Sequence, residues 1–169
     1  MKSDPNHLDP DSISNHPVEG QLDQLFRMQS ELNDTIYKSN DIRNSFGKVL
    51  ETCDFILEIF KPIDHDLGPN RLVNEWLKRY ADAMEWEIDE LRESLCKKFW
   101  SKDKVDLQNV RVELIDILHF LISAMIVAGM TPESILQVYS QKHAINLKRQ
   151  EEGYNKQSKT EEDNRRIEA

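Results

Sequence analysis

The sequence is poor in the residues on which several classes of protein depend. It has two cysteines, Cys53 and Cys96, which are too few for a disulfide framework and fit a reducing compartment such as the cytoplasm. Basic residues are also in deficit, because 22 Lys and Arg stand against 31 Asp and Glu, for a net charge of −9. Nucleic-acid polymers and anionic membranes are bound through excess Lys and Arg, so we expect neither as a partner. A small anion that binds together with a metal ion remains compatible with this charge.

Strand patterns and long apolar runs are missing as well. Charged residues interrupt the most apolar stretch, 114–128, too early for a bilayer crossing, and no basic and apolar leader follows Met1. We therefore expect a soluble, cytoplasmic protein that does not bind membranes.

What the sequence does contain is a helical pattern. Apolar residues recur at the 3.6-residue period in about five segments: 18–38, 41–60, 71–98, 107–128 and 132–149. The pattern predicts an all-α helix bundle that forms one domain over residues 18–154. The polar ends predict a disordered N-terminal segment, 1–17, and a flexible C-terminal tail, 155–169.

Two pairs of carboxylates are the most informative feature. Glu87 and Glu90 lie three residues apart in one predicted helix, and Glu113 and Asp116 lie three apart in another that is otherwise almost wholly apolar. We expect this second helix to be buried around most of its circumference. Residues i and i+3 share a helix face, so each pair points one way. Because buried carboxylates need a cation, a partner or a raised pKa, two such faces opposite each other would suit a hard divalent ion. We expect Mg²⁺ there, with Mn²⁺ as a second candidate.

Polar residues occur in unexpected places on two further helices. Gln29 and Asn33 fall within the apolar arc of the first predicted helix, where the two amides could bind a pyrimidine edge or simply join two helices. Lys142, Asn146 and Arg149 share a face of the last predicted helix. These cations could grip phosphate oxygens or could complement the helix C-terminus.

Several stretches together resemble the dimeric, all-α dUTPases of the MazG-like NTP pyrophosphatase superfamily, including the phage dCTPase/dUTPase branch. They are Met28-Gln29-x-x-Leu32-Asn33-Asp34, Glu87-Ile-Asp-Glu90-Leu, Lys98-Phe-Trp100, Val112-Glu113-Leu-Ile-Asp116-Ile-Leu-His-Phe and Lys142-x-x-x-Asn146-x-x-Arg149-Gln-x-x-Gly153-Tyr154. The resemblance implies the MazG-like fold and a homodimer or higher homo-oligomer with active sites at subunit contacts.

The resemblance also implies an activity, the Mg²⁺-dependent hydrolysis of a deoxynucleoside triphosphate. The best candidate substrate is dUTP, cleaved to dUMP and pyrophosphate by a dUTP diphosphatase. The implied roles are as follows: Glu87, Glu90, Glu113 and Asp116 bind metal; Glu90 is also the catalytic general base; Lys142, Asn146, Arg149 and Tyr154 bind phosphate; Gln29, Asn33 and Trp100 surround the base and sugar.

Other functions remain open from the sequence. A dCTP-specific or broad-specificity pyrophosphohydrolase would share the same motifs. A di-iron oxidoreductase would need two Glu-x-x-His motifs, whereas this chain offers only Asp116-x-x-His119, so we expect His119 to be a hydrogen-bonded core residue. A non-catalytic helical interaction module would leave the buried carboxylates paired with Lys or Arg.

Overall fold

The computed structural model describes residues 20–44, 46–59, 71–95, 100, 104–151 and 165–167. Within these ranges the helices are, in order, α1 Gln21–Ser39, α2 Thr52–Ile59, α3 Arg71–Glu93, α4 Leu107–Val127 and α5 Pro132–Glu151. The described residues contain no strand beyond one isolated bridge between Arg43 and Val49. The predicted all-α fold is confirmed. The segments expected to be disordered or flexible, 1–17 and most of 155–169, lie outside the described residues.

The second helix is shorter than predicted, because it begins at Thr52 and not at Asp41. Asp41 and Gly47 adopt positive φ angles of 49° and 74°, which a helix does not allow. Between them the Asn44 side chain accepts hydrogen bonds from two backbone N–H groups of the loop, at 3.0 and 3.1 Å. Such side-chain bonds favour turns over helices. The carboxylate of Asp34 then accepts a hydrogen bond from the Thr52 N–H at 2.7 Å, which supports the first turn of α2.

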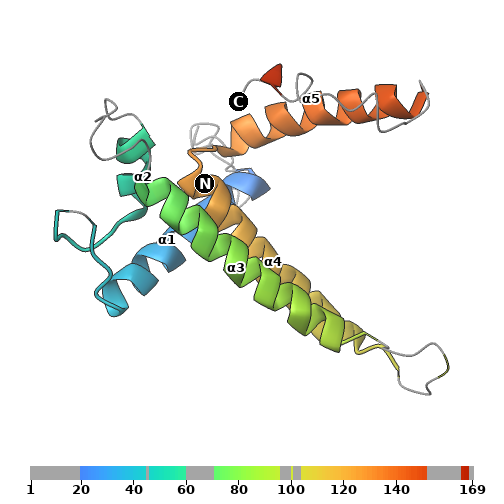
Figure 1. Cartoon of the computed structure of the whole chain (residues 1–169), viewed down its shortest axis with the longest axis horizontal. Helices are drawn as coiled ribbons and strands as arrows, with labels where there is room; N and C mark the ends of the chain where they lie inside the picture. Colours follow the sequence, from blue (N-terminus) through green and yellow to red (C-terminus); the bar gives the residue numbers. More distant parts are fainter. Residues whose placement is uncertain are drawn as a thin grey trace, which may run out of the picture.

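The long helices α3 and α4 form an antiparallel pair that is the axis of the molecule (Figure 1). α1 packs against α4, and α2 packs against both α3 and α4 near one end of the pair. After α4 the chain turns through 101°, so that α5 leaves the pair and contacts α1. No single helix in the described ranges has both the length and the hydropathy of a membrane span, although the bent pair α4 and α5 reaches them jointly.

An aromatic core fixes one end of the α3–α4 pair. Tyr37 of α1, Phe55 of α2, and Trp76 and Tyr80 of α3 pack edge to face or tilted, with the rings of Tyr37 and Trp76 4.9 Å apart. The hydroxyl groups of Tyr37 and Tyr80 share a hydrogen bond of 2.6 Å. Burial raises the pKa of both phenols. Aromatic side chains remove large apolar areas from water, so this end carries much of the stability.

The opposite end of the pair has almost no apolar core. Among residues 84–95 and 104–121, Glu113 is the one side chain that is buried. The sequence predicted that α4 would be buried around most of its circumference, and within a single chain this is wrong. Several apolar side chains of α4 are 37% to 53% exposed: Val112, Leu114, Ile115 and Leu121. One chain therefore does not bury all of the apolar surface of α4.

Candidate active site

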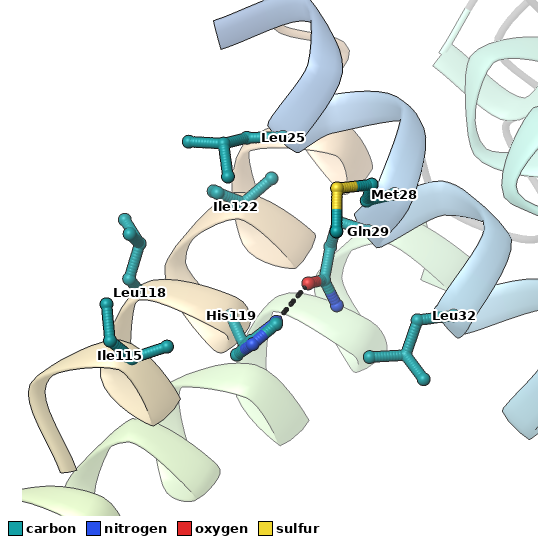
Figure 2. Close-up of a pocket in the computed structure, with 8 residues that line it drawn as sticks. All are labelled: Leu25, Met28, Gln29, Leu32, Ile115, Leu118, His119 and Ile122. Atoms are coloured by element: carbon teal, nitrogen blue, oxygen red, sulfur yellow. Dashed lines mark hydrogen bonds between the residues drawn. The ribbon is translucent and has the colours of Figure 1, made fainter. Parts of the chain in front are cut away.

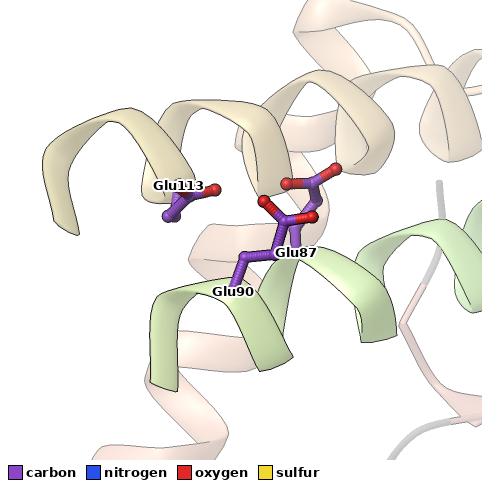
Figure 3. Close-up of side chains that lie close together, drawn as sticks. All are labelled: Glu87, Glu90 and Glu113. Carbon is purple, nitrogen blue, oxygen red and sulfur yellow. The ribbon is translucent and has the colours of Figure 1, made fainter. Parts of the chain in front are cut away.

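Three of the four predicted metal ligands converge between α3 and α4. One carboxylate oxygen from each of Glu87, Glu90 and Glu113 lies within 4.8 Å of the others. Figure 3 shows Glu87 and Glu90 extending from α3 toward α4, which carries Glu113. Glu113 is only 6% exposed, Glu87 is half-buried and Glu90 is exposed. The fourth residue, Asp116, is half-buried on the next turn of α4 and lies outside this group of three.

The electrostatics of this cluster are unfavourable without a cation. The pKa of the Glu87 carboxyl is raised, first by burial and then by repulsion from Glu90, Asp116 and Glu113. Asp116 is therefore close enough to act on the cluster. Within the described residues, no Lys or Arg forms an ion pair with any of these four carboxylates. This observation counts against the non-catalytic interaction module, for which we expected such pairs.

The donor set fits a hard divalent ion. All of the converging atoms are carboxylate oxygens, and none comes from His or Cys, so the set matches the preference of Mg²⁺ or Mn²⁺. Asn109, which the sequence analysis missed, donates from Nδ2 to Glu113 at 2.8 Å and to the Ser94 hydroxyl at 2.6 Å. It therefore orients one ligand and joins α4 to the end of α3. Its position four residues before Glu113 was the available signal.

The two predicted base-binding amides lie at the centre of the buried face of α1. Gln29 is 5% exposed and Asn33 is 3% exposed. Gln29 Nε2 donates to Asn33 Oδ1 at 3.0 Å and to the Ser123 hydroxyl at 2.9 Å, and Gln29 Oε1 lies 2.6 Å from His119 Nδ1. The amides thus join α1 to α4, as one of the two sequence interpretations required. Asn33 Nδ2 is buried and makes no hydrogen bond.

A pocket of about 250 Å³ opens between α1 and α4 beside these amides. Figure 2 shows Leu25, Met28 and Leu32 of α1 facing Ile115, Leu118 and Ile122 of α4, with Gln29 and His119 as its polar members. The sequence suggested His119 as a hydrogen-bonded core residue. The hydrogen bond is present, but the ring is exposed at the pocket. An apolar cleft with a few directed polar groups is typical of a small-molecule site.

The predicted phosphate-binding residues are not beside the carboxylates of the same chain. On α5, Lys142 is half-buried, Asn146 is exposed and Arg149 is 8% exposed. Glu113 and Lys142 are separated by most of α4, the 101° turn and half of α5 (Figure 1). With a rise of 1.5 Å per helical residue and the two helix segments joined at the 101° turn, the straight distance between Glu113 and Lys142 is roughly 20 Å.

The two remaining predicted residues give less information. Trp100 is 70% exposed in the connection between α3 and α4. Tyr154 lies outside the described residues.

The fold and the cluster together define an all-α protein with an acidic site between two antiparallel helices. A family model described as dUTPase matches residues 21–131, more than half of the chain. The chain belongs to this all-α, MazG-like dUTPase family. The matched range contains α1 to α4 with the four carboxylates and both amides, and it ends just before α5.

Phage enzymes are among the relatives. The chain is 32% identical to a dCTP pyrophosphatase of Enterobacteria phage T4 over 80 residues, which are 47% of this chain and 40% of that protein. It is 33% identical over 79 residues to a dCTP pyrophosphatase of Enterobacteria phage LZ5, with the same coverage of both chains. The match therefore spans less than half of these relatives. No solved structure matches the chain.

Proposed function

We propose that this protein is a metal-dependent pyrophosphohydrolase that cleaves dUTP with water to dUMP and pyrophosphate. The observation that carries the proposal is the cluster of three glutamates between α3 and α4, which lie within 4.8 Å of one another and form no ion pair with a Lys or Arg of the described part of the chain. Membership of the dUTPase family supports the substrate class. The net charge supports a metal-complexed anion over a polymer.

Glu87, Glu113 and Asp116 hold Mg²⁺ in this proposal, and Glu90 contributes as a ligand and as the general base. A bound divalent ion neutralises phosphate oxygens and lowers the pKa of water. Glu90 is the most exposed member of the cluster, so its carboxylate can take the proton of the attacking water. Asn109 keeps the Glu113 carboxylate turned toward α3.

A second copy of the chain completes the site in this proposal. Within one chain the basic face of α5 lies roughly 20 Å from the carboxylates, too far for one Lys side chain to span. Apolar side chains are exposed on α1, α4 and α5, among them Met28 at 54%, Leu114 at 50% and Leu136 at 66%. Burying such surfaces favours association, so we propose a homodimer or larger homo-oligomer in which Lys142, Asn146, Arg149 and Tyr154 serve a neighbouring cluster.

The pocket between α1 and α4 is the proposed base site, with Gln29 at its polar side, Asn33 bonded behind Gln29, and Trp100 as a further proposed contact. The specific alternative is dCTP, because both phage relatives named above are dCTP pyrophosphatases. Uracil and cytosine present different donors and acceptors at their hydrogen-bonding edges. A site with buried amides can distinguish them, because the wrong base leaves a buried polar group unpaired at a cost of about 1–3 kcal/mol.

The deciding experiment is pyrophosphate release from each common nucleoside triphosphate, with Mg²⁺, with Mn²⁺ and with EDTA. We expect dUTP to be the preferred substrate and EDTA to abolish the reaction. Asp116→Asn should lose activity with unchanged helix content, whereas Asp89→Asn, an exposed neighbour that pairs with Arg92, should keep it. Full activity in EDTA would refute the metal mechanism, and preference for dCTP would select the alternative.

A further inference from the structure

The polar network behind the base pocket has a direction that starts at a backbone group. Ser123 is 1% exposed on α4, and its hydroxyl donates to the backbone carbonyl of His119 at 2.9 Å. A carbonyl oxygen can only accept, and a serine has one hydroxyl hydrogen. A second acceptor, Asn33 Oδ1, lies 3.2 Å from Ser123 Oγ. Whether the single hydrogen goes to the carbonyl or is shared with Asn33 Oδ1, it is committed to an acceptor, so Ser123 Oγ acts as an acceptor toward Gln29.

The direction passes from Ser123 to Gln29. The distance of 2.9 Å between Ser123 Oγ and the Gln29 side chain requires the amide NH₂ at that position. The second amide hydrogen goes to Asn33 Oδ1 at 3.0 Å. Both hydrogens of Gln29 are then used within α1 and α4, and Oε1 must face the His119 ring, 2.6 Å from Nδ1.

The same chain of bonds determines the proton on the imidazole. Because Gln29 Oε1 can only accept, Nδ1 of His119 must carry the hydrogen. A neutral imidazole has one N–H, so the other nitrogen, Nε2, is left with a free lone pair. His119 is exposed and lines the pocket, so this lone pair is available to a ligand.

We propose that Ser123 is a positioning residue that, through Gln29, holds His119 in the tautomer protonated at Nδ1, so that Nε2 accepts a hydrogen bond from the bound nucleotide. The role of Nε2 toward a nucleotide rests on the proposed function, whereas the tautomer does not. The ligand group is an N–H or O–H donor, which a deoxyuridine nucleotide offers at N3 of the base and at the sugar 3′-hydroxyl.

The opposite arrangement explains why Ser123 matters. If the Gln29 amide turned over, its oxygen would face Ser123, which would have to withdraw its hydrogen from the His119 carbonyl. Nδ1 would then accept from Gln29, and the proton would move to Nε2. Removing the hydroxyl leaves Asn33 as the remaining partner of the Gln29 NH₂, and the Asn33 amide can turn over together with Gln29 because its Nδ2 makes no hydrogen bond.

The first test is long-range ¹H–¹⁵N correlation of the histidine rings in the full chain without nucleotide, at about pH 8.5, well above the ordinary histidine pKa of roughly 6.5. The signals of His119 are assigned by their loss in His119→Gln. Wild type should show Nδ1 protonated, Ser123→Ala should show a mixture or the Nε2-protonated form, and Ser123→Thr should restore the wild-type pattern because it keeps the hydroxyl.

Ser30→Ala is the matched control, since Ser30 on α1 makes the same bond to the carbonyl four residues earlier, Phe26, at 2.9 Å and lies outside this network. It should leave the His119 tautomer unchanged. A wild-type ring protonated at Nε2, or a Ser123→Ala spectrum identical to wild type, would overturn the proposal. The wild-type spectrum can refute the proposed tautomer even if a Ser123 variant fails to fold, and Ser123→Thr, which keeps the hydroxyl, then tests the role of Ser123.

The second test is kinetic. Ser123→Ala should raise KM for the preferred nucleotide about tenfold with kcat within about twofold, because a ground-state contact is weakened. In wild type, N3-methyl-dUTP and 3′-deoxy-dUTP each remove one donor, and the analogue that loses affinity identifies the partner of Nε2. Equal binding of dUTP and both analogues would refute the contact. If no nucleotide is hydrolysed, the proposed function fails, and the spectra still decide the tautomer.

Discussion

Replacing Glu113 by Gln should stabilise the metal-free protein while it destroys metal binding. Glu113 is the buried member of the cluster, and the change keeps its shape and the hydrogen bond that Asn109 donates at 2.8 Å. It removes one negative charge that lies within 4.8 Å of Glu87 and Glu90. A stabilising effect of removing a buried polar ligand is not expected of an ordinary structural residue.

The magnitude follows from Coulomb's law. Two unit charges at the 4.8 Å limit of the cluster repel by about 1 kcal/mol in water and by about 3.5 kcal/mol at an effective dielectric constant of roughly 20. Since Glu90 is exposed and its charge is screened, we expect the unfolding free energy without metal to rise by about 1–3 kcal/mol. For a domain of this size that corresponds to roughly 2–10 °C in Tm.

The assay is thermal unfolding of wild type and Glu113→Gln in EDTA and over a Mg²⁺ titration, with isothermal calorimetry for Mg²⁺ affinity. Wild type should gain Tm with Mg²⁺, and the variant should not. Affinity and activity should fall by more than about a hundredfold, because losing only an outer partner of a ligand typically costs 10–100-fold. Glu85→Gln, on an exposed turn of α3, is the control. A destabilised variant in EDTA, or one that still binds Mg²⁺ normally, would refute the electrostatic reasoning.

Three further predictions follow from the same structure. Asn109→Ala should weaken Mg²⁺ binding about 10–100-fold in calorimetry while kcat at saturating metal changes little, and unchanged affinity would deny Asn109 a positioning role. Without metal, the unfolding free energy should fall as pH rises from the ordinary glutamate pKa of 4.5 through the raised folded-state pKa of Glu87, because the charged carboxylate is disfavoured in the folded state. Mg²⁺ should remove this pH dependence, and an equal slope with and without Mg²⁺ would contradict the electrostatic explanation. Light scattering should give a dimer or larger for wild type and a smaller mass for Leu114→Lys, whereas a monomeric, fully active wild type would rule out a shared site.

The helices and the convergence of three of the four predicted metal ligands could be predicted because both depend on local spacing. An i, i+3 pair shares a face in any helix, so Glu87 and Glu90 were correctly placed together, and Glu113 faces them across an antiparallel pair. The prediction of a helix before Thr52 was wrong, because it used the apolar period alone and ignored the turn preferences of Asn44 and Gly47.

Contacts between distant segments could not be read from spacing. The bond from Gln29 to Ser123 joins residues 94 positions apart, so its partner was unknown until the fold was described. The exposure of α4 was missed for a different reason. The apolar pattern records the burial that a helix needs but does not say whether the same chain supplies it.

The uneven distribution of the core along α3 and α4 has a consequence for motion. Aromatic rings near Trp76 hold the two helices together at one end, whereas like charges near Glu87 repel at the other end. The pair is therefore firmly joined at one end only. Local opening takes place where few apolar contacts oppose it, which here is the acidic end. Amide hydrogens of residues 87–93 and 107–113 should therefore exchange faster than those of 73–80 and 120–127 in EDTA. A divalent ion bound by the carboxylates would hold these two helix ends together. The order of both ends would then depend on whether the proposed ion is bound.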